Sequence, residues 1–467
     1  MSFPHFGRGT RWVIAGALCL GGLAACNTLP RITPDMALRP ARQVQVQGMH
    51  GPLSAARSKA ILDGLKSRGA DSDIFNSHLA LEEALAGSPL VAGNKVVLLQ
   101  DGASTYEAML AAILDARDHI NMETYILEDD EVGRRFADAL LARQQRGVQV
   151  NLIHDAVGSL GTPREYFQRL TDGGVRVLEY GPVNPLTARA GWNVNQRDHR
   201  KLIVVDGRVA FLGGVNISGV YSASGSLRGS SKPRRGGVLP WRDTHLQIEG
   251  PVVGEFQKLF IETWERQKGD PLAPRNYFPA PVNRGKEVVR ALGGAPEEPF
   301  SAIYATLISA IDNAEIEVLL TNAYFAPDPQ LLAVLKAAVK RGVDVRLLLP
   351  SATDSALIFH AGRSYYDELL RAGVKIYERH EALLHSKTAL IDGVWSTVGS
   401  TNLDWRSFLH NQELNAVVLG PEFGAQMRAA FDRDLAASNP IILEQWERRG
   451  LDLRLKETFA RLWAYWL

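Results

Sequence analysis

The stretch HRKLIVVDG at residues 199–207 decides the fold, because it recurs as HSKTALIDG at residues 385–393. A second segment follows each copy at the same spacing, GGVN at 213–216 and GSTN at 399–402. The histidine, lysine, aspartate, glycine and asparagine positions coincide without a gap. One motif repeated at matched spacing predicts two homologous lobes within one chain.

Each motif reads as a strand that ends in a tight turn. Residues two apart in a strand point to the same side, so each histidine projects together with its lysine. The Asp-Gly pairs at 206–207 and 392–393 are hairpin-turn dipeptides that fold each strand back onto the segment carrying the asparagine. Each lobe therefore offers an imidazole, an ammonium and an amide: His199, Lys201 and Asn216 from the first copy, and His385, Lys387 and Asn402 from the second.

Composition excludes several classes of protein. The 467 residues are 46% hydrophobic and 22% charged, which excludes a disordered chain and a polytopic membrane protein. The 52 Lys and Arg balance the 51 Asp and Glu, so bulk charge does not favour nucleic-acid binding. Two cysteines, Cys19 and Cys26, cannot form a disulfide framework or a cysteine-based zinc site in the body of the chain.

The N-terminus reads as a secretion signal. Arg8 and Arg11 precede an apolar run over 12–25 that is too short for a mature membrane span. The run ends in LAAC at 23–26, which resembles the bacterial lipoprotein cleavage box and implies removal of residues 1–25 and lipidation of Cys26. By the same resemblance, Asn27 favours a periplasm-facing lipoprotein of the outer membrane. The alternatives are a generic signal peptide or a buried helix.

Strand and helix patterns alternate along the rest of the chain and then repeat, with RGVQV at 146–150 matching RGVDV at 341–345. This order predicts an α/β fold of two similar α/β/α lobes packed around a pseudo-two-fold axis, with one active site between them. The expected segments are a tether and lead-in over 26–92, a first lobe over 93–268, a proline-rich linker over 269–285, a second lobe over 286–440 and an amphipathic segment over 441–467.

The doubled HxKxxxxD motif, each copy followed by G-[GS]-x-N, resembles the phospholipase D superfamily. FLGGVNI at 211–217 and WRDTH at 241–245 further resemble its bacterial cardiolipin synthase branch. The resemblance implies that His199 is the nucleophile that forms a phosphohistidine and that His385 is the general acid and base. It also implies that Asp243 and Glu413 orient these histidines.

A phosphodiester repels nucleophiles and has a poor leaving group, so its site needs fixed cations, a nucleophile and an acid. The cations here are lysines, and we expect neither a metal nor another cofactor. Phosphate oxygens are expected to be bound by Lys201, Lys387, Asn216, Ser400 and Asn402. Asp206 and Asp392 complete the catalytic motif, although their place at turns favours a structural role.

Several other features have a structural and a functional interpretation. Tyr125 and Tyr324 recur with the repeat and are expected in the core. His154, His245 and His360 have no matched partner and are expected to be structural. The segment 222–237, rich in Ser, Gly and Arg, is either a solvated linker or a lid that meets anionic lipid headgroups. The aromatic C-terminus, residues 459–467, suits either a membrane interface or a helix packed on the lobes.

Three functions fit the sequence. The first is a phosphatidyltransferase that joins phospholipids as cardiolipin synthases do, with phosphatidylglycerol or phosphatidylethanolamine as donor and a glycerol hydroxyl as acceptor. The expected phospholipid substrates are phosphatidylglycerol, phosphatidylethanolamine or cardiolipin. The second is a hydrolase of phospholipid or nucleic acid, and the third is an inactive envelope lipoprotein that binds partners. The motifs do not separate transfer from hydrolysis, because water and an alcohol use the same intermediate; the branch resemblance favours transfer. Nucleic acid is not an expected partner, and a monomer suffices for one site.

Overall fold

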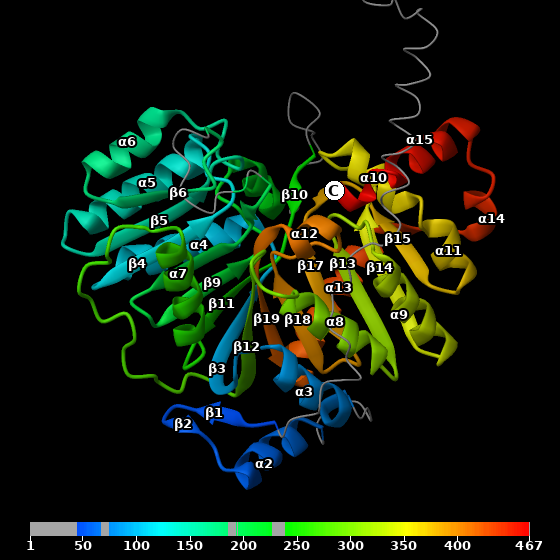
Figure 1. Cartoon of the computed structure of the whole chain (residues 1–467), viewed down its shortest axis with the longest axis horizontal. Helices are drawn as coiled ribbons and strands as arrows, with labels where there is room; N and C mark the ends of the chain where they lie inside the picture. The colour runs from blue at the N-terminus through cyan, green and yellow to red at the C-terminus, as the bar shows by residue number, and fades with distance from the viewer. Residues whose placement is uncertain (1–43, 67–73, 185–192, 194, 227–238, 467) are drawn as a thin grey trace, which may run out of the picture.

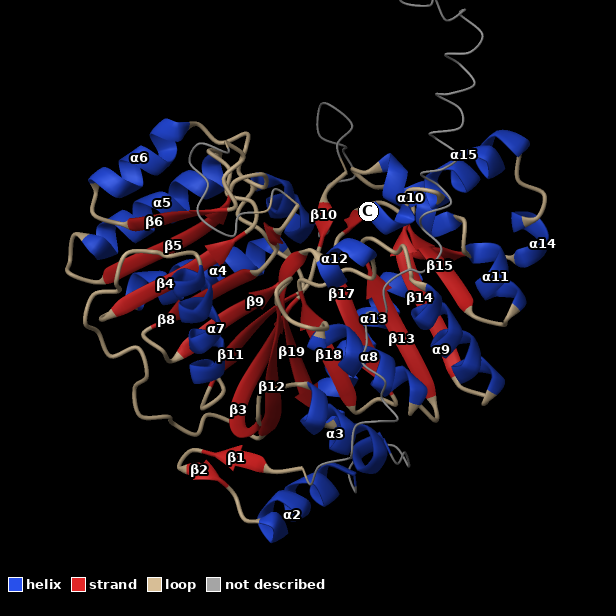
Figure 2. Cartoon of the chain, viewed as in Figure 1, coloured by secondary structure: helices blue, strands red, loops and turns tan. Residues whose placement is uncertain are grey.

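The computed structural model describes residues 44–66, 74–184, 193, 195–226 and 239–466. Two lobes lie side by side in it, each built on one half of the sheet (Figure 1). Helices cover the strands of both lobes (Figure 2). The signal segment with Cys26 lies outside the described residues, as does most of the segment 222–237.

The two half-sheets share one strand order. Three parallel strands are followed by four strands that alternate in direction. In the first lobe the order is β6 (Arg176–Tyr180), β5 (Gln149–Asp155), β4 (His119–Thr124), β8 (Lys201–Val205), β9 (Val209–Gly213), β11 (His245–Glu249) and β3 (Leu90–Leu99).

The second lobe repeats this order, and the edge strands of the two lobes pair with each other. Its strands are β15 (Lys375–Arg379), β14 (Asp344–Pro350), β13 (Glu317–Asn322), β17 (Lys387–Ile391), β18 (Trp395–Gly399), β19 (Asn411–Leu419) and β12 (Glu287–Gly294). β3 pairs antiparallel with β12 and joins the two halves. The predicted α/β fold with two homologous lobes is therefore confirmed.

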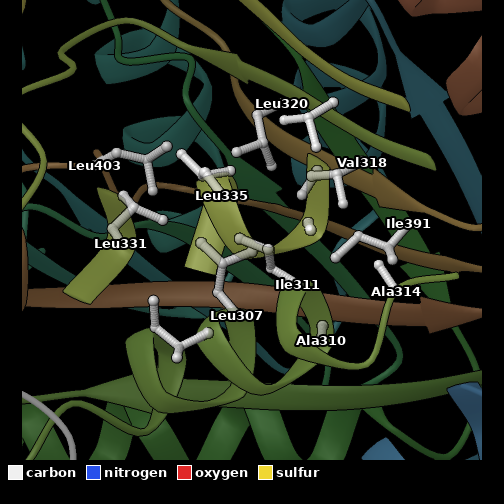
Figure 3. Packing of buried hydrophobic residues seen from close by; sticks show 14 of the residues in the cluster. Leu307, Ala310, Ile311, Ala314, Val318, Leu320, Leu331, Leu335, Ile391 and Leu403 are labelled. Carbon is white, nitrogen blue, oxygen red and sulfur yellow. The ribbon is translucent and has the colours of Figure 1, made fainter. Parts of the chain in front are cut away.

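Helices cover the sheet on both faces, and some of them begin at a capping aspartate. The outer faces carry α4 (Gly102–Asp115), α5 (Glu131–Gln144) and α6 (Arg164–Asp172) in the first lobe, and α8 (Ala302–Asp312) and α9 (Pro329–Lys340) in the second. Asp101, Asp130 and Asp328 each accept a hydrogen bond from a backbone amide of the first helical turn. In the core of the second lobe, Leu307, Leu331 and Leu335 pack against Val318 and Ile391 of the sheet (Figure 3).

The other face of the sheet forms a core that both lobes share. It is covered by α7 (Val253–Arg266) and α13 (Pro421–Ala436). Phe256 and Phe260 of α7 belong to one buried cluster with Phe423 of α13 and with strand residues of both lobes, such as Val204 and Leu390. This common core fixes the two motif strands relative to each other.

The expectation that residues 26–92 are a tether is wrong for the described part. β1 (Val46–Gly48), β2 (Gly51–Pro52), α2 (Ala55–Lys66) and α3 (Ile74–Leu85) pack on the second lobe, and β1 runs parallel to β3. Glu82 on α3 lies 2.8 Å from Arg290 and accepts a hydrogen bond from the Trp395 indole. Because α3 buries His78 and Glu82, its core face lacks the apolar pattern that would have revealed it.

Residues 267–286 form no helix or strand, as the prolines predict for the linker. The linker lies on the first lobe, where Arg275 donates to the Gly147 carbonyl. The chain ends in α14 (Leu443–Trp446), α15 (Leu451–Arg461) and the short 3-10 helix η4 (Ala464–Trp466), and α15 packs against α10 (Ala356–Arg363). Within the described ranges, every helix is too short or too polar to span a bilayer.

Candidate active site

A short strand precedes each motif histidine and pairs with a strand of the opposite lobe. β7 (Arg197–Asp198) pairs with the start of β19, and β16 (Leu383–Leu384) pairs with β10 (Trp241–Arg242). The backbone amide of His199 donates to the Gln412 carbonyl at 3.0 Å, and that of His385 donates to the Arg242 carbonyl at 2.8 Å. Each motif thus begins beside the strand of the opposite lobe that carries an acid.

Each motif histidine is hydrogen-bonded to an acid from the opposite lobe, an arrangement called here the exchange of acids. His199 Nδ1 lies 3.0 Å from Glu413 Oε1 of the second lobe, and His385 Nδ1 lies 2.7 Å from Asp243 Oδ2 of the first. All four side chains are buried. A carboxylate at Nδ1 fixes the tautomer of the ring and leaves Nε2 as the reactive nitrogen.

The two motif lysines lie beside these rings. Lys201 Nζ donates to the His199 carbonyl at 2.5 Å, and Lys387 donates to the His385 carbonyl. The charges of both lysines lower the pKa of His385, after the larger effect of its burial. Both imidazoles and both ammonium groups therefore belong to one electrostatic cluster.

Burial sets the charge states of the cations. It lowers the pKa of Lys201 to about 7 and that of Lys387 to about 8. Burial, reinforced by the neighbouring Lys201 charge, lowers the pKa of His199 to about 4. Burial and Lys387 hold the pKa of His385 well below its usual range. Without a bound anion both rings are therefore neutral at pH 7.

The two acids differ in charge. Burial raises the pKa of Asp243 to about 6, although Lys387 opposes this shift. Burial would also raise the pKa of Glu413, but His199, Lys201 and the Ser400 hydroxyl together lower it to about 2. His199 thus faces a permanent carboxylate, whereas His385 faces a carboxyl group that titrates near neutral pH.

Of the uncharged residues expected to bind phosphate, Asn216 and Ser400 are engaged within the protein, whereas the side-chain oxygen of Asn402 is not. Asn216 accepts from the Ile126 amide and donates to the Tyr221 hydroxyl, so its side chain holds the site loop together. Ser400 donates to Glu413 Oε2 at 2.5 Å and supports the acid rather than facing outward. The Asn402 Oδ1 atom is buried and has no hydrogen-bond partner among the described residues.

Asp206 and Asp392 belong to the motif but not to the site, which corrects their place in the catalytic set. Asp206 accepts from the backbone amides of residues 117, 118 and 119, which lead into β4. Asp392 does the same for residues 315, 316 and 317, which lead into β13. Both carboxylates hold the end of the sheet opposite the histidines, and their role is structural.

The two repeated tyrosines line the site, so the prediction that they are core residues is wrong. The Tyr125 ring lies 5.1 Å from the His199 ring and also 5.1 Å from Lys201 Nζ. Tyr324 lies 6.0 Å from the His385 ring and donates to Asp354. Both follow the last residues of a parallel strand, where the chain turns over the sheet edge and the strand alternation no longer applies.

Sequence reasoning gave no role to Tyr221 or Arg200, and it quoted Trp241 only for the branch resemblance. The Trp241 ring lies 4.8 Å from His385, and the Tyr221 hydroxyl lies 3.4 Å from His385 Nδ1. Arg200, buried behind the motif, donates to the carbonyls of Glu413 and Gly294 and so links the lobes. The sequence does contain a signal for Arg200: side chains alternate along a strand, so the residue between His199 and Lys201 points to the side opposite theirs.

The three unmatched histidines lie outside the two histidine–acid pairs. His154 stacks on Phe167 with ring centroids 3.9 Å apart, and burial lowers its pKa to about 4. His245 is buried on β11, and His360 lies on α10. In the part of the chain that the structure describes, no cluster of three or more His, Cys, Asp or Glu side chains could hold a metal ion.

Comparison with known proteins shows the family to which the chain belongs. A family model described as "Cardiolipin synthase, PLD-like domain" matches residues 109–221 and 307–435, one segment in each lobe. The chain belongs to the phospholipase D-like cardiolipin synthase family. It is therefore an enzyme of the phospholipase D type, and the paired half-sites are the two copies of the motif of that family.

Relatives cover most of this phospholipase D-like chain. A cardiolipin synthase of Geobacillus sp. (strain WCH70) is 35% identical over 82% of this chain and 74% of the relative. A cardiolipin synthase of Alkalihalophilus pseudofirmus is 33% identical over 85% and 76%. The crystal structure of a phosphatidylserine synthase from Haemophilus influenzae Rd KW20 shares the fold, with a TM-score of 0.61, 15% identity and coverage of 82% of this chain and 97% of that chain.

Proposed function

We propose that this enzyme is a cardiolipin synthase-like phosphatidyltransferase that moves a phosphatidyl group between phospholipids through a phosphohistidine. The observation that carries the proposal is the exchange of acids between two buried histidines, His199 with Glu413 and His385 with Asp243. The donor is phosphatidylglycerol or phosphatidylethanolamine, and the acceptor is a glycerol hydroxyl. Transfer rather than hydrolysis is supported by the names of the similar enzymes.

The first half of the reaction forms the covalent intermediate. Glu413 accepts a hydrogen bond from Nδ1–H of His199, which leaves the Nε2 lone pair free to attack phosphorus. The bond from phosphorus to the departing alcohol oxygen breaks, and His385 gives that oxygen its proton. The phosphodiester anion favours the protonated form of His385 on binding, because an opposite charge stabilises the imidazolium.

The second half regenerates the enzyme. Neutral His385 takes the proton of the acceptor hydroxyl, whose oxygen attacks phosphorus as the bond to His199 breaks. Lys201 and Lys387 stabilise the charge on the phosphate oxygens in both halves. The buried Asn402 oxygen is a suitable acceptor for a substrate hydroxyl, since it has no partner in the described residues.

The difference between the two acids supports this division of labour. A nucleophile needs a ring that stays neutral and oriented, and the permanent charge on Glu413 provides it. A general acid and base must gain and lose a proton, and Asp243, with a pKa of about 6, tolerates both states of its partner.

The proposed setting is the bacterial envelope. Cleavage before Cys26 and lipidation of its thiol would anchor the enzyme as a periplasm-facing lipoprotein, with Asn27 favouring the outer membrane. Labelling cells with radioactive palmitate is expected to mark the wild type and not Cys26→Ala. Label that persists in the variant would contradict the anchor.

Product analysis tests the function. Purified enzyme is incubated with phosphatidylglycerol, and the lipids are measured by mass spectrometry, with His199→Ala as the control. Cardiolipin and free glycerol in equal amounts are expected from the wild type alone. Phosphatidic acid without cardiolipin would show a hydrolase, and no product would leave an inactive binding protein.

A further inference from the structure

The outward face of α15 and η4 is apolar. Leu451, Leu455 and Phe459 are 77%, 70% and 59% exposed, and Leu462 is 64% exposed. Trp466 extends the same row and is 60% exposed. Their spacing of three or four residues places them on one side of the helix. A soluble surface helix has polar residues on that side, so this face is not explained by folding alone.

The inward face of α15 is made of different residues. Glu457, Ala460 and Ala464 are the buried positions, and Glu457 pairs with Arg449 at 2.8 Å. The helix therefore turns small and polar side chains, together with the half-buried Leu453, toward the protein and leaves most of its large apolar side chains outside. A contiguous exposed apolar face of this kind marks an interaction surface.

This surface lies at the end of the molecule where the motif histidines lie. α10 follows the carboxyl end of β14, and the Tyr465 ring packs 5.4 Å from Trp405, close after Asn402 in the chain. Figure 1 shows α15 and the C-terminus at the same end of the molecule as α10, α12 (Trp405–Leu409) and β10. The first lobe contributes exposed Leu160 and Leu239 at this end, after β5 and before β10.

Charges border the apolar row. Arg454, Lys456 and Arg461 are exposed on α15, and their positions fall on both flanks of the row. Asp452 is the one exposed acid on this helix, because Glu457 is buried. An apolar stripe with cationic borders and tryptophan at its end suits the interface of an anionic bilayer.

We propose that α15 and η4 lie in the headgroup region of an anionic bilayer and hold the mouth of the site against the membrane. The inference rests on the proposed function, because a lipid substrate must pass from the bilayer into the site. A second copy of the chain fits this surface less well, since an isologous contact would bring the same cationic borders together. The docking surface acts independently of any lipid on Cys26.

The test uses the full chain and two matched variants. Leu455→Ser combined with Phe459→Ser changes the docking surface, and Leu114→Ser changes an apolar residue, 49% exposed, at the end of α4 away from the site. Turnover is measured on phosphatidylglycerol vesicles and on a short-chain phosphatidylglycerol dissolved below its micelle concentration. Quenching of tryptophan fluorescence by brominated lipid in the vesicles reports insertion, and a Trp463→Phe and Trp466→Phe variant identifies the signal of these two residues.

The proposal expects the double variant to lose about tenfold in vesicle turnover while its turnover of the dissolved lipid stays unchanged. Leu114→Ser should match the wild type on both substrates. Quenching should be strong for the wild type and weak without Trp463 and Trp466. Full vesicle turnover by the double variant, or no quenching of these tryptophans, overturns the proposal.

Other outcomes separate the two proposals. Quenching without turnover of either lipid would leave the docking surface intact and contradict the phosphatidyltransferase function. A dimer in light scattering that the double variant abolishes would assign the surface to a second copy instead.

Discussion

The two halves of the site share a motif but differ in what stands behind each histidine. In one half the long Glu413 reaches His199 and is held by the Ser400 hydroxyl. In the other half the shorter Asp243 reaches His385, and Gly214 stands where Ser400 would be. A Cβ atom on Gly214 would lie 2.1 Å from Asp243 Oδ1, so this half has no room for a side chain there.

This difference shows how a duplicated motif takes on two roles. The hydroxyl and the imidazole together keep Glu413 ionised, with its pKa lowered to about 2. Asp243 lacks the hydroxyl, and burial raises its pKa to about 6. In the proposed mechanism the motif residues carry out the chemistry, and the acids behind them determine which histidine is the nucleophile and which is the general acid.

Removing either motif imidazole is expected to have the largest effect on activity. His199→Ala and His385→Ala should each lower kcat on phosphatidylglycerol by about 1,000-fold or more, because neither half has a substitute for the other. His154→Ala, which removes a buried histidine outside the site, is the control for folding. Substantial activity in either motif variant would contradict a shared site.

Replacing each acid by its amide should lower kcat in both halves of the site, but by different factors. Glu413→Gln is expected to lower kcat by about 100-fold, because it removes a permanent charge and leaves the His199 tautomer unset. Asp243→Asn should cost about tenfold, since Asp243 is already partly protonated near neutral pH. Steady-state kinetics at pH 7 measures both, and equal losses would contradict the division of roles.

The pH profile should reflect the lysines that both halves share. Burial disfavours the charged form, so Lys201 keeps its proton below about pH 7 and Lys387 below about pH 8. Between about pH 7 and pH 8, kcat/KM should fall by about tenfold per pH unit, because the free enzyme loses the Lys201 cation that binds phosphate. Above about pH 8, where Lys387 loses its proton as well, the fall should be about 100-fold per pH unit. A kcat/KM that stays level up to pH 9 would show that the lysines are not buried in this way.

Ser400→Gly makes the two halves alike at this position and should have the smallest effect. Losing one hydrogen bond to Glu413 is expected to lower kcat by about fivefold, with KM unchanged. Ser396→Ala, which changes a buried serine on β18, the strand that leads to Ser400, should have no effect on kcat. A higher KM with unchanged kcat would instead support the phosphate-binding role that the sequence predicts for Ser400.

The lobes, their order and the paired histidine and lysine residues could be predicted from the sequence, because each repeats at a fixed spacing. The exchange of acids could not, because Asp243 and Glu413 lie in the lobe opposite their histidine and their distances along the chain carry no signal. The packing of the N-terminal helices on the second lobe was missed for a different reason: Glu82 is buried there beside Arg290, and a buried ion pair hides the apolar period of a helix.

Trapping the intermediate tests the central claim most directly. His385→Ala is given a short-chain phosphatidyl p-nitrophenyl ester, whose leaving group needs no acid, and the protein is quenched in base and digested. A phosphatidyl adduct is expected on His199, where it accumulates because no base activates the acceptor, and no adduct is expected in His199→Ala. An adduct on His385 in the wild type, or turnover in His199→Ala, would contradict that claim.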